Sequence, residues 1–368
     1  MPQNSIQSLL RETFLSPDKE VWKQFASQEL EGKNPDEVLS WNTESGVSFQ
    51  AYYDSSDEKR NPLSNKFRVT VADDPFFGPA KWLNAPFVSV TSETVANETA
   101  LQHLTNGADA IFFSCPQQVN LEYLLNGIDW RYCSLFFEIG EQRNFVHELK
   151  SFILKNFAPD DSLSGGLFWE TVPKIENSED SNLSGLKNFL TVKSSTSVHE
   201  ISEALLAGVR LVEQANTPTL AVFKSIGFSV SAGTSFLETI AKIRALRFLW
   251  FQVAHAYGHS AFAPGDLHIH ARSEKWINEK FQPHGNLLKS TLASMAAVIG
   301  GANAITIFPE DPSHTMMNRI ARNVSNLLRE ESHLDKVADP SAGAYAIDAM
   351  TEEFAKHAWK TFQEKQAK

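Results

Sequence analysis

The stretch GDLHIHARSEKW, from Gly265 to Trp276, carries the residues of this chain whose types and spacing most suggest chemistry. It places Asp266, His268 and His270 on alternate positions, and alternate side chains of a β-strand lie on the same face. A His-x-His pair can hold a metal ion if other strands supply at least one further histidine or carboxylate. The candidates for that role are Glu138, Glu170 and His103. This first interpretation would make the chain a metal-dependent hydrolase.

Two other interpretations fit the same stretch. Proteins that bind cobalamin with its base displaced use the pattern Asp-x-His-x-x-Gly, which Asp266 and His268 begin but which Ala271 breaks at the glycine position. Alternatively, the histidines are packed and hydrogen-bonded in a protein core and bind no ligand. The residues by themselves leave all three interpretations open.

Composition and charge limit the class of protein. The chain has 368 residues, 42% hydrophobic and 21% charged, which suffices for one large domain or two smaller ones. A net charge of −11 disfavours nucleic acid and anionic membranes as partners. Only Cys115 and Cys133 are present, so we expect a reducing compartment and a cytoplasmic protein. No stretch reaches the roughly 18 consecutive apolar residues of a membrane span.

The elements that must position the histidines follow from periodicity. Residues 1–65 are expected to form an N-terminal helical leader and linker that contacts a partner, with a helix capped at Ser16-Pro17-Asp18 and stopped at Gly32. Residues 66–368 alternate apolar strands with amphipathic helices. The expected strands are 86–92, 109–115, 134–140, 166–172, 189–195, 226–232, 266–272 and 304–309.

Eight such strands predict an α/β fold, specifically a (β/α)8 TIM barrel with the helical leader before it. No glycine-rich phosphate loop follows a strand, which argues against an open dinucleotide-binding sheet. The arginine-bearing helix around Arg319, Arg322 and Asn323 is expected to present these side chains to solvent.

Several longer segments resemble the barrel domain of the methylmalonyl-CoA mutase family, in the same order and with similar spacing. They are SSTSVHEISEALLAGVRLVE (194–213), FLETIAKIRALRFLW (236–250), TLASMAAVIGGANAI (291–305), RIARNVSNLLREES (319–332) and VADPSAGAY (337–345). The leader is similar to that of the small, non-catalytic subunits of heterodimeric mutases. The residues that carry this similarity are Trp22, Gly32, Lys33, Trp41, Thr43 and Gly46.

The resemblance implies a barrel that, in catalytic chains, threads a CoA substrate along its axis and works with a C-terminal cobalamin domain. A Tyr-His pair of the family, whose histidine donates to the substrate carbonyl, aligns with Asn188 and Phe189. Phenylalanine cannot donate a hydrogen bond, so we expect no catalytic residue here. The family strand Arg-x-His-x-Gln, aligned on Trp276, becomes His268, His270 and Arg272, which are then degenerate substrate-binding candidates.

Two further departures from the family agree with this. The segment FRVTVADDPFFGPAKW (67–82) lacks the family's substrate-contacting Arg-Gly-x-Tyr-Pro pattern, and no cobalamin-binding domain follows the barrel within 368 residues. The resemblance therefore implies a non-catalytic small-subunit barrel that binds no metal or cofactor by itself.

In this interpretation the chain forms a heterodimer with a catalytic large subunit that holds adenosylcobalamin. The complex would interconvert methylmalonyl-CoA and succinyl-CoA in propionate metabolism. The alternative is an active acyl-CoA mutase barrel that works with a separate cobalamin-binding chain, with His270 or His268 orienting the acyl-CoA.

Overall fold

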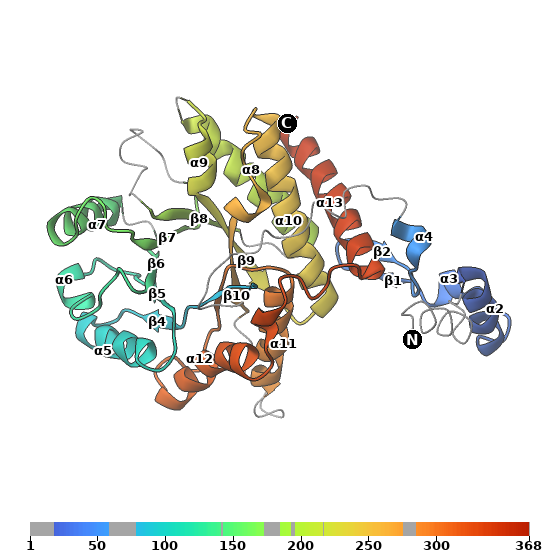
Figure 1. Ribbon diagram of the computed structural model, residues 1–368, viewed down its shortest axis with the longest axis horizontal. Helices are drawn as coiled ribbons and strands as arrows, with labels where there is room; N and C mark the ends of the chain where they lie inside the picture. Colours follow the sequence, from blue (N-terminus) through green and yellow to red (C-terminus); the bar gives the residue numbers. More distant parts are fainter. Residues whose placement is uncertain are drawn as a thin grey trace, which may run out of the picture.

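A parallel sheet of nine strands forms the centre of the protein (Figure 1). The computed structural model describes residues 18–58, 79–140, 143–172, 185–192, 196–215, 217–274 and 285–367. The sheet order is β3-β11-β10-β9-β8-β7-β6-β5-β4. Its strands are β3 (Leu83–Asn84), β4 (Phe87–Ser89), β5 (Ala110–Ser114), β6 (Ser134–Glu138), β7 (Ser164–Trp169), β8 (Lys187–Thr191), β9 (Ile226–Ala232), β10 (His268–Ser273) and β11 (Ala304–Thr306).

The two ends of this order, β3 and β4, are parts of one extended segment, which closes the sheet into a barrel. The N–H of Ala85 donates to the carbonyl oxygen of Ile305 (3.0 Å), and the carbonyl oxygen of Pro86 accepts from Phe112 (3.0 Å). Pro86 has no N–H to give to a ladder, which is consistent with the break in strand assignment there. Counting residues 83–89 as one strand gives eight, so the predicted (β/α)8 barrel is confirmed.

Helices surround the barrel because the outward side chains of the strands are apolar and must be covered. The helices between the strands are α5 (Glu93–Leu104), α6 (Leu121–Leu124), α7 (Arg143–Asn156), α8 (Ser197–Gln214), α9 (Leu220–Ser225), α10 (Phe236–Ala256) and α11 (Gly285–Ile299), and α12 (Thr315–Glu330) and α13 (Tyr345–Gln366) follow the last strand. Short 3₁₀ turns lie at Pro264–Asp266 and Leu334–Lys336. α13 packs against both α8 and α10. Within the described ranges, no helix is long and apolar enough to span a bilayer.

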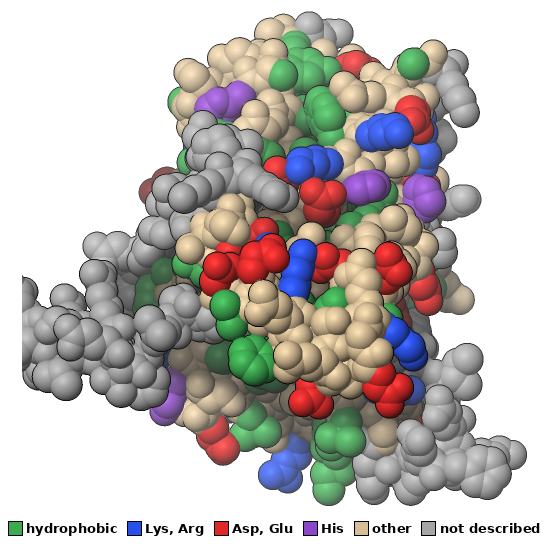
Figure 2. Space-filling model, turned by 90° about the vertical axis from the view of Figure 1, so that its right-hand side faces the viewer, with side chains coloured by type: hydrophobic (Ala, Val, Ile, Leu, Met, Phe, Trp, Pro, Cys, Tyr) green, Lys and Arg blue, Asp and Glu red, His purple; other side chains and the backbone are tan. Residues whose placement is uncertain are grey.

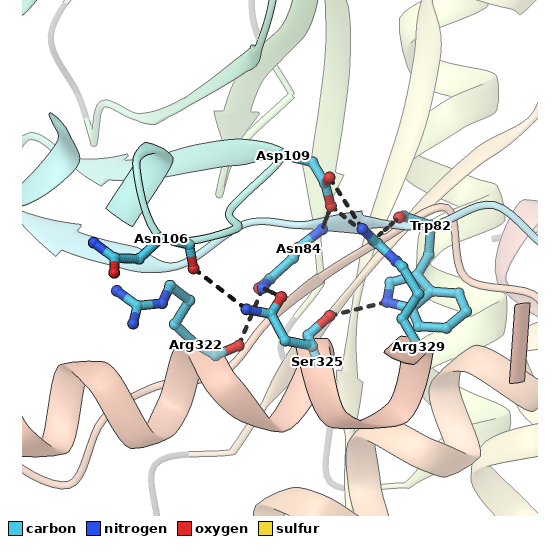
Figure 3. A network of polar contacts seen from close by, with 8 residues as sticks. Trp82, Asn84, Asn106, Asp109, Arg322, Ser325 and Arg329 are labelled. Atoms are coloured by element: carbon cyan, nitrogen blue, oxygen red, sulfur yellow. Dashed lines mark hydrogen bonds and ion pairs between the residues drawn. The ribbon is translucent and has the colours of Figure 1, made fainter. Parts of the chain in front are cut away.

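A polar network fastens α12 to the N-terminal end of the barrel (Figure 3). Arg329 forms a two-pronged ion pair with Asp109, at 2.7 and 3.1 Å, and also donates to the carbonyl oxygen of Trp82 (2.7 Å). The amide of Asn84 donates to the carbonyl oxygen of Arg322 (3.0 Å). The indole of Trp82 donates to Ser325 (2.9 Å). α12 therefore holds β3 and the residue before β5 together at this end of the barrel.

The position of Arg322 differs from the solvent-exposed position that the sequence predicts. Its side chain is buried, 6% exposed, and its guanidinium lies 3.4 Å from the imidazole of His103 on α5. The solvated position predicted for this residue is wrong because His103 of α5 lies against its guanidinium. Amphipathic periodicity identifies an apolar stripe but does not show which charged side chain a neighbouring helix will cover.

The described part of the leader consists of a projecting half and an anchored half. The projecting half is α2 (Lys19–Glu29), capped by Asp18, and α3 (Pro35–Val38). The anchored half is a hairpin of β1 (Trp41–Asn42) and β2 (Ser48–Phe49), followed by α4 (Ser55–Glu58). Phe49 is buried, and its ring lies 5.7 Å from that of Phe354 on α13.

The projecting half lies at the edge of the molecule, beyond α13 (Figure 1). Trp22 of this half is partly buried and stacks on Tyr52, but several other large apolar side chains are exposed. They are Val21, Phe25, Val38 and Leu39, with Trp41 at the start of the hairpin. On the side of the molecule that Figure 2 shows, apolar side chains are visible among charged ones. The leader thus presents apolar area that the described ranges of the chain leave exposed.

Candidate functional site in the barrel interior

The inner face of β10 carries the residues that the sequence singled out. His268, His270 and Arg272 alternate along the strand, and His270 lies among side chains of the barrel interior. His268 stands at the start of the strand and Arg272 near its C-terminal end. Asp266 lies before the strand, where it pairs with Lys224 at 3.0 Å. The structure thus keeps the two histidines on one face and separates Asp266 from them.

Phenylalanine rings surround His270 in the middle of the barrel. They come from four consecutive strands, β5 to β8, and their centroids lie 4.8 to 5.9 Å from the imidazole centroid. These rings belong to Phe112, Phe136, Phe168 and Phe189, and together with His270 we call them the aromatic plug. His270 itself has no exposed surface. The plug occupies the barrel axis at the level of this histidine.

Hydrogen bonding fixes the proton on His270. Thr306 donates its hydroxyl to the carbonyl oxygen of Ala85 (2.7 Å), so it can only accept from Nε2 of His270 (2.7 Å). The ring therefore carries its proton on Nε2, and Nδ1 is an acceptor. Burial, with the nearby charge of Arg272, holds the pKa of His270 well below its usual 6.5. The imidazole is neutral.

Asn188 and Phe189 are the residues that the sequence resemblance predicts in place of a Tyr-His pair. Phe189 lies flat on Phe168, with centroids 4.7 Å apart and planes 11° apart. Two glycines make room for it, since a Cβ on Gly166 or Gly227 would approach its ring to 2.9 or 2.6 Å. Asn188 points the other way and accepts from the indole of Trp169 (3.0 Å). Neither residue offers a hydrogen-bond donor to the barrel interior.

An ion pair crosses the C-terminal mouth of the barrel. Arg272 donates to Glu138 of β6 at 3.0 Å, and its guanidinium lies 5.9 Å from the ring centroid of Phe168. Glu138 also accepts from the hydroxyl of Ser114 (3.0 Å). In a TIM barrel this end is where chemistry usually takes place. Here Arg272 and Glu138 are bonded to each other above the aromatic plug.

At the N-terminal end, His268 lies among cations. Burial lowers its pKa to about 3, and the charges of Lys187 and Arg247 act in the same direction. Lys187 donates to the carbonyl oxygen of Lys224 (2.7 Å). A neutral histidine in the barrel wall beside two cations does not suit the exposed loop position of a cobalamin ligand.

The metal interpretation finds no support in the described residues, among which no three histidine, cysteine or acidic side chains gather. Of the further ligands considered, Glu138 is bound to Arg272 and His103 contacts Arg322 on the outer helices. The packed histidine of the third interpretation describes His270 best. Trp276, on which the family strand was aligned, and most of segment 67–82 lie outside the described residues.

The aromatic plug is not among the features predicted from the sequence. The signal was present, since each of the four strand candidates from 109 to 195 has a phenylalanine that alternation could place inside. Alternation alone does not say which face of a parallel strand is inner, because both faces are buried. Neighbouring phenylalanines, such as Phe113 and Phe137, face outward.

The sequence of the chain is similar to known proteins of one family. The methylmalonyl-CoA mutase family model matches residues 191–368. A methylmalonyl-CoA mutase small subunit from Porphyromonas gingivalis is 27% identical, over 94% of this chain and 62% of the relative. The small subunit from Streptomyces virginiae is 35% identical over 46% of this chain and 28% of the relative. The chain spans at most about six tenths of these relatives.

Among solved structures, the chain resembles a dihydropteroate synthase from Stenotrophomonas maltophilia. That likeness has a TM-score of 0.42 at 13% identity, and it covers 68% of this chain and 95% of the other.

Proposed function

We propose that the chain, which is similar to methylmalonyl-CoA mutase small subunits, is a small-subunit-type barrel that stabilises a catalytic large subunit and does not itself carry out the rearrangement. The complex would interconvert methylmalonyl-CoA and succinyl-CoA. In this proposal the large subunit supplies the substrate channel and adenosylcobalamin. The observation that carries the proposal is the aromatic plug.

The plug supports a non-catalytic role by its position and packing. A CoA substrate threaded along the axis would have to displace Phe168 and Phe189, which stack on each other, from the centre of the barrel. Removing large core side chains from such sites typically costs about 3–5 kcal/mol each. An acyl-CoA would have to offset that loss before binding.

The charges inside the barrel support the same role. His270 uses its only N–H on Thr306, and the charge of Arg272 is already paired with Glu138, so binding a thioester or a carboxylate here would compete with contacts within the barrel. Adenosylcobalamin, when bound in a mutase, supplies the radical chemistry and the protein positions and shields the reactants. In this chain His268, the histidine of the cobalamin-like pattern, stands at the start of barrel strand β10 and is held neutral by burial, so it does not suit that cofactor.

The leader supports the proposal that the chain has a partner. Its projecting half exposes Val21, Phe25, Val38 and Leu39, while its hairpin is anchored in the core by Val47 and Phe49. Because its hairpin is fixed to the barrel and its projecting half is apolar, the leader is suited to bind a second chain. An obligate interface of this kind should bury roughly 2,000 Å² or more. The proposal includes a cytoplasmic location, in keeping with two cysteines that are both unpaired.

The first experiment is purification of the native protein from its own cells, with mass spectrometry of co-purifying chains and a mutase assay. We expect a stoichiometric larger mutase chain, bound cobalamin and activity. Recovery of this protein alone, without cobalamin, would contradict the proposal.

A second experiment separates it from the active-barrel alternative. In the reconstituted complex, His268→Gln and His270→Gln in this chain should leave kcat and KM for methylmalonyl-CoA unchanged, provided gel filtration shows the intact complex. If either substitution abolishes turnover in an intact complex, this barrel is catalytic. A parallel titration of the isolated chain with methylmalonyl-CoA should show no binding.

A further inference from the structure

Three buried polar atoms without a hydrogen-bond partner lie next to one another on the inner face of the barrel. They are Oγ1 of Thr191, Oγ of Ser229 and Nδ1 of His270. The ladder pairs Thr191 of β8 with Ser229 of β9, and Ser229 with His270 of β10. The three side chains are 7%, 1% and 0% exposed. We call them the polar row.

The polar row differs in location from the other buried side-chain nitrogen and oxygen atoms that lack a hydrogen-bond partner. The described residues contain nine, and the remaining six belong to residues outside the barrel strands, on helices α5, α10 and α12 and the 3₁₀ turn at Leu334–Lys336. Folded proteins rarely leave buried polar groups unsatisfied. Three of them at paired positions on adjacent strands indicate one shared partner.

The chemistry of the row restricts that partner. Nδ1 of His270 can only accept, because its proton is on Nε2, so the partner must donate at least one hydrogen bond. The two hydroxyls can each donate or accept. A cation is disfavoured by Arg272, the next inward residue of β10, and an anion is disfavoured by the lone pair of Nδ1.

Aromatic rings lie beside the polar row and limit the size of any partner. The rings of Phe136 and Phe189 lie with their centroids 4.8 and 5.9 Å from that of His270. Thr191 and Ser229 stand one inward position above Phe189 and Gly227 on their strands. Only a molecule of one or two heavy atoms suits such a site, and buried waters commonly make about three hydrogen bonds.

We infer that one ordered water molecule is bound inside the closed barrel by Thr191, Ser229 and His270. It donates to Nδ1 of His270 and to one hydroxyl, and it accepts from the other. The water joins three neighbouring strands on the inner face and fixes the orientation of the His270 ring. This inference does not depend on the mutase assignment.

The test is a high-resolution crystal structure of the whole chain, together with magnetic relaxation dispersion, which counts long-lived internal waters in solution. We expect one peak within hydrogen-bond distance, about 2.7–3.2 Å, of all three atoms. The variant Thr191→Val/Ser229→Ala, which removes both hydroxyls and little volume, should lose that peak and one long-lived water.

Ser294→Ala is the matched control, since it removes a buried hydroxyl that is bonded to the carbonyl oxygen of Ser290 (2.7 Å). It should leave the count of internal waters unchanged. If the double variant does not fold, Ser229→Ala alone should weaken the peak and shorten the residence time. A wild-type structure in which Ser229 donates directly to Nδ1 with no water between would overturn the inference, and so would an unchanged water count in the double variant.

Discussion

The ring of Phe189 lies flat against the ring of Phe168 in the centre of the barrel, with the two ring centroids 4.7 Å apart. Phe189→Ala should therefore open a cavity and lower the free energy of unfolding by about 3–5 kcal/mol, as large core truncations do. Urea unfolding followed by tryptophan fluorescence measures this. Tyr132→Ala, at a side chain 86% exposed, should change stability by less than about 0.5 kcal/mol. A similarly small effect of Phe189→Ala would mean that the plug is not packed as described.

Gly227 should tolerate a side chain only when Phe189 is truncated. A Cβ at this position would lie 2.6 Å from the phenyl ring, so Gly227→Ala should cost about 1–3 kcal/mol through overpacking. In the Phe189→Ala background the same substitution should cost less. A double-mutant cycle of unfolding free energies measures the coupling. Gly233→Ala, whose new Cβ would make an ordinary 3.4 Å contact with Glu274, should show no coupling to Phe189.

The pH dependence of stability should include a contribution from His270. Its folded pKa lies well below the usual 6.5, so between these values the unfolded chain binds a proton that the folded chain does not. The free energy of unfolding is unaffected by the ionisation of His270 above about pH 6.5. Below that pH it falls, by up to about 1.4 kcal/mol per pH unit. In His270→Gln, the slope of the unfolding free energy against pH between pH 6.5 and 5 should decrease by the amount that corresponds to about one bound proton. Equal slopes in wild type and variant would show that His270 is protonated in the fold.

The ion pair between Asp109 and Arg329 should hold α12 to the barrel. Asp109→Asn removes the charge but keeps the shape, and we expect a loss of about 2 kcal/mol because charged hydrogen bonds are the stronger class. The side chains are 16% and 12% exposed, so solvent screening is limited. Comparison with Arg329→Gln and the double variant isolates the pair. Additive effects of the two substitutions would contradict a direct interaction.

Phe25 should contribute to binding of a large mutase subunit and not to the stability of this chain. Its side chain is 65% exposed on α2, so Phe25→Ser should change the unfolding free energy by less than about 0.5 kcal/mol. At a buried interface the same change should weaken association by at least about tenfold, or about 1.4 kcal/mol. Surface plasmon resonance against the large subunit measures it. Tyr132→Ser, at the loop between α6 and β6, is the control; equal affinities for both variants would exclude the projecting half of the leader from the interface.

The strand pattern was readable because the barrel uses short apolar runs separated by amphipathic helices. The predicted strand at 226–232 coincides with β9, and the others differ from the observed strands by a few residues at their ends. The leader hairpin was missed, since Trp41–Asn42 and Ser48–Phe49 are too short for alternation to show. β3 was missed for the same reason, although it contributes to barrel closure.

The lack of a hydrogen-bond donor on the side chain of Phe189 could be read from the sequence, because a residue type either can or cannot donate a hydrogen bond; its alignment with a family histidine stays a prediction. What fills the barrel could not be read there. Whether Phe112 or Phe113 faces inward depends on how β5 sits between its neighbours, and both choices are equally apolar. Residues far apart in sequence meet only when the sheet closes, as Glu138 and Arg272 do. The sequence therefore determined the kind of fold and the lack of a donor at Phe189, whereas the tertiary structure decided that the barrel axis is occupied by packed rings around a neutral His270.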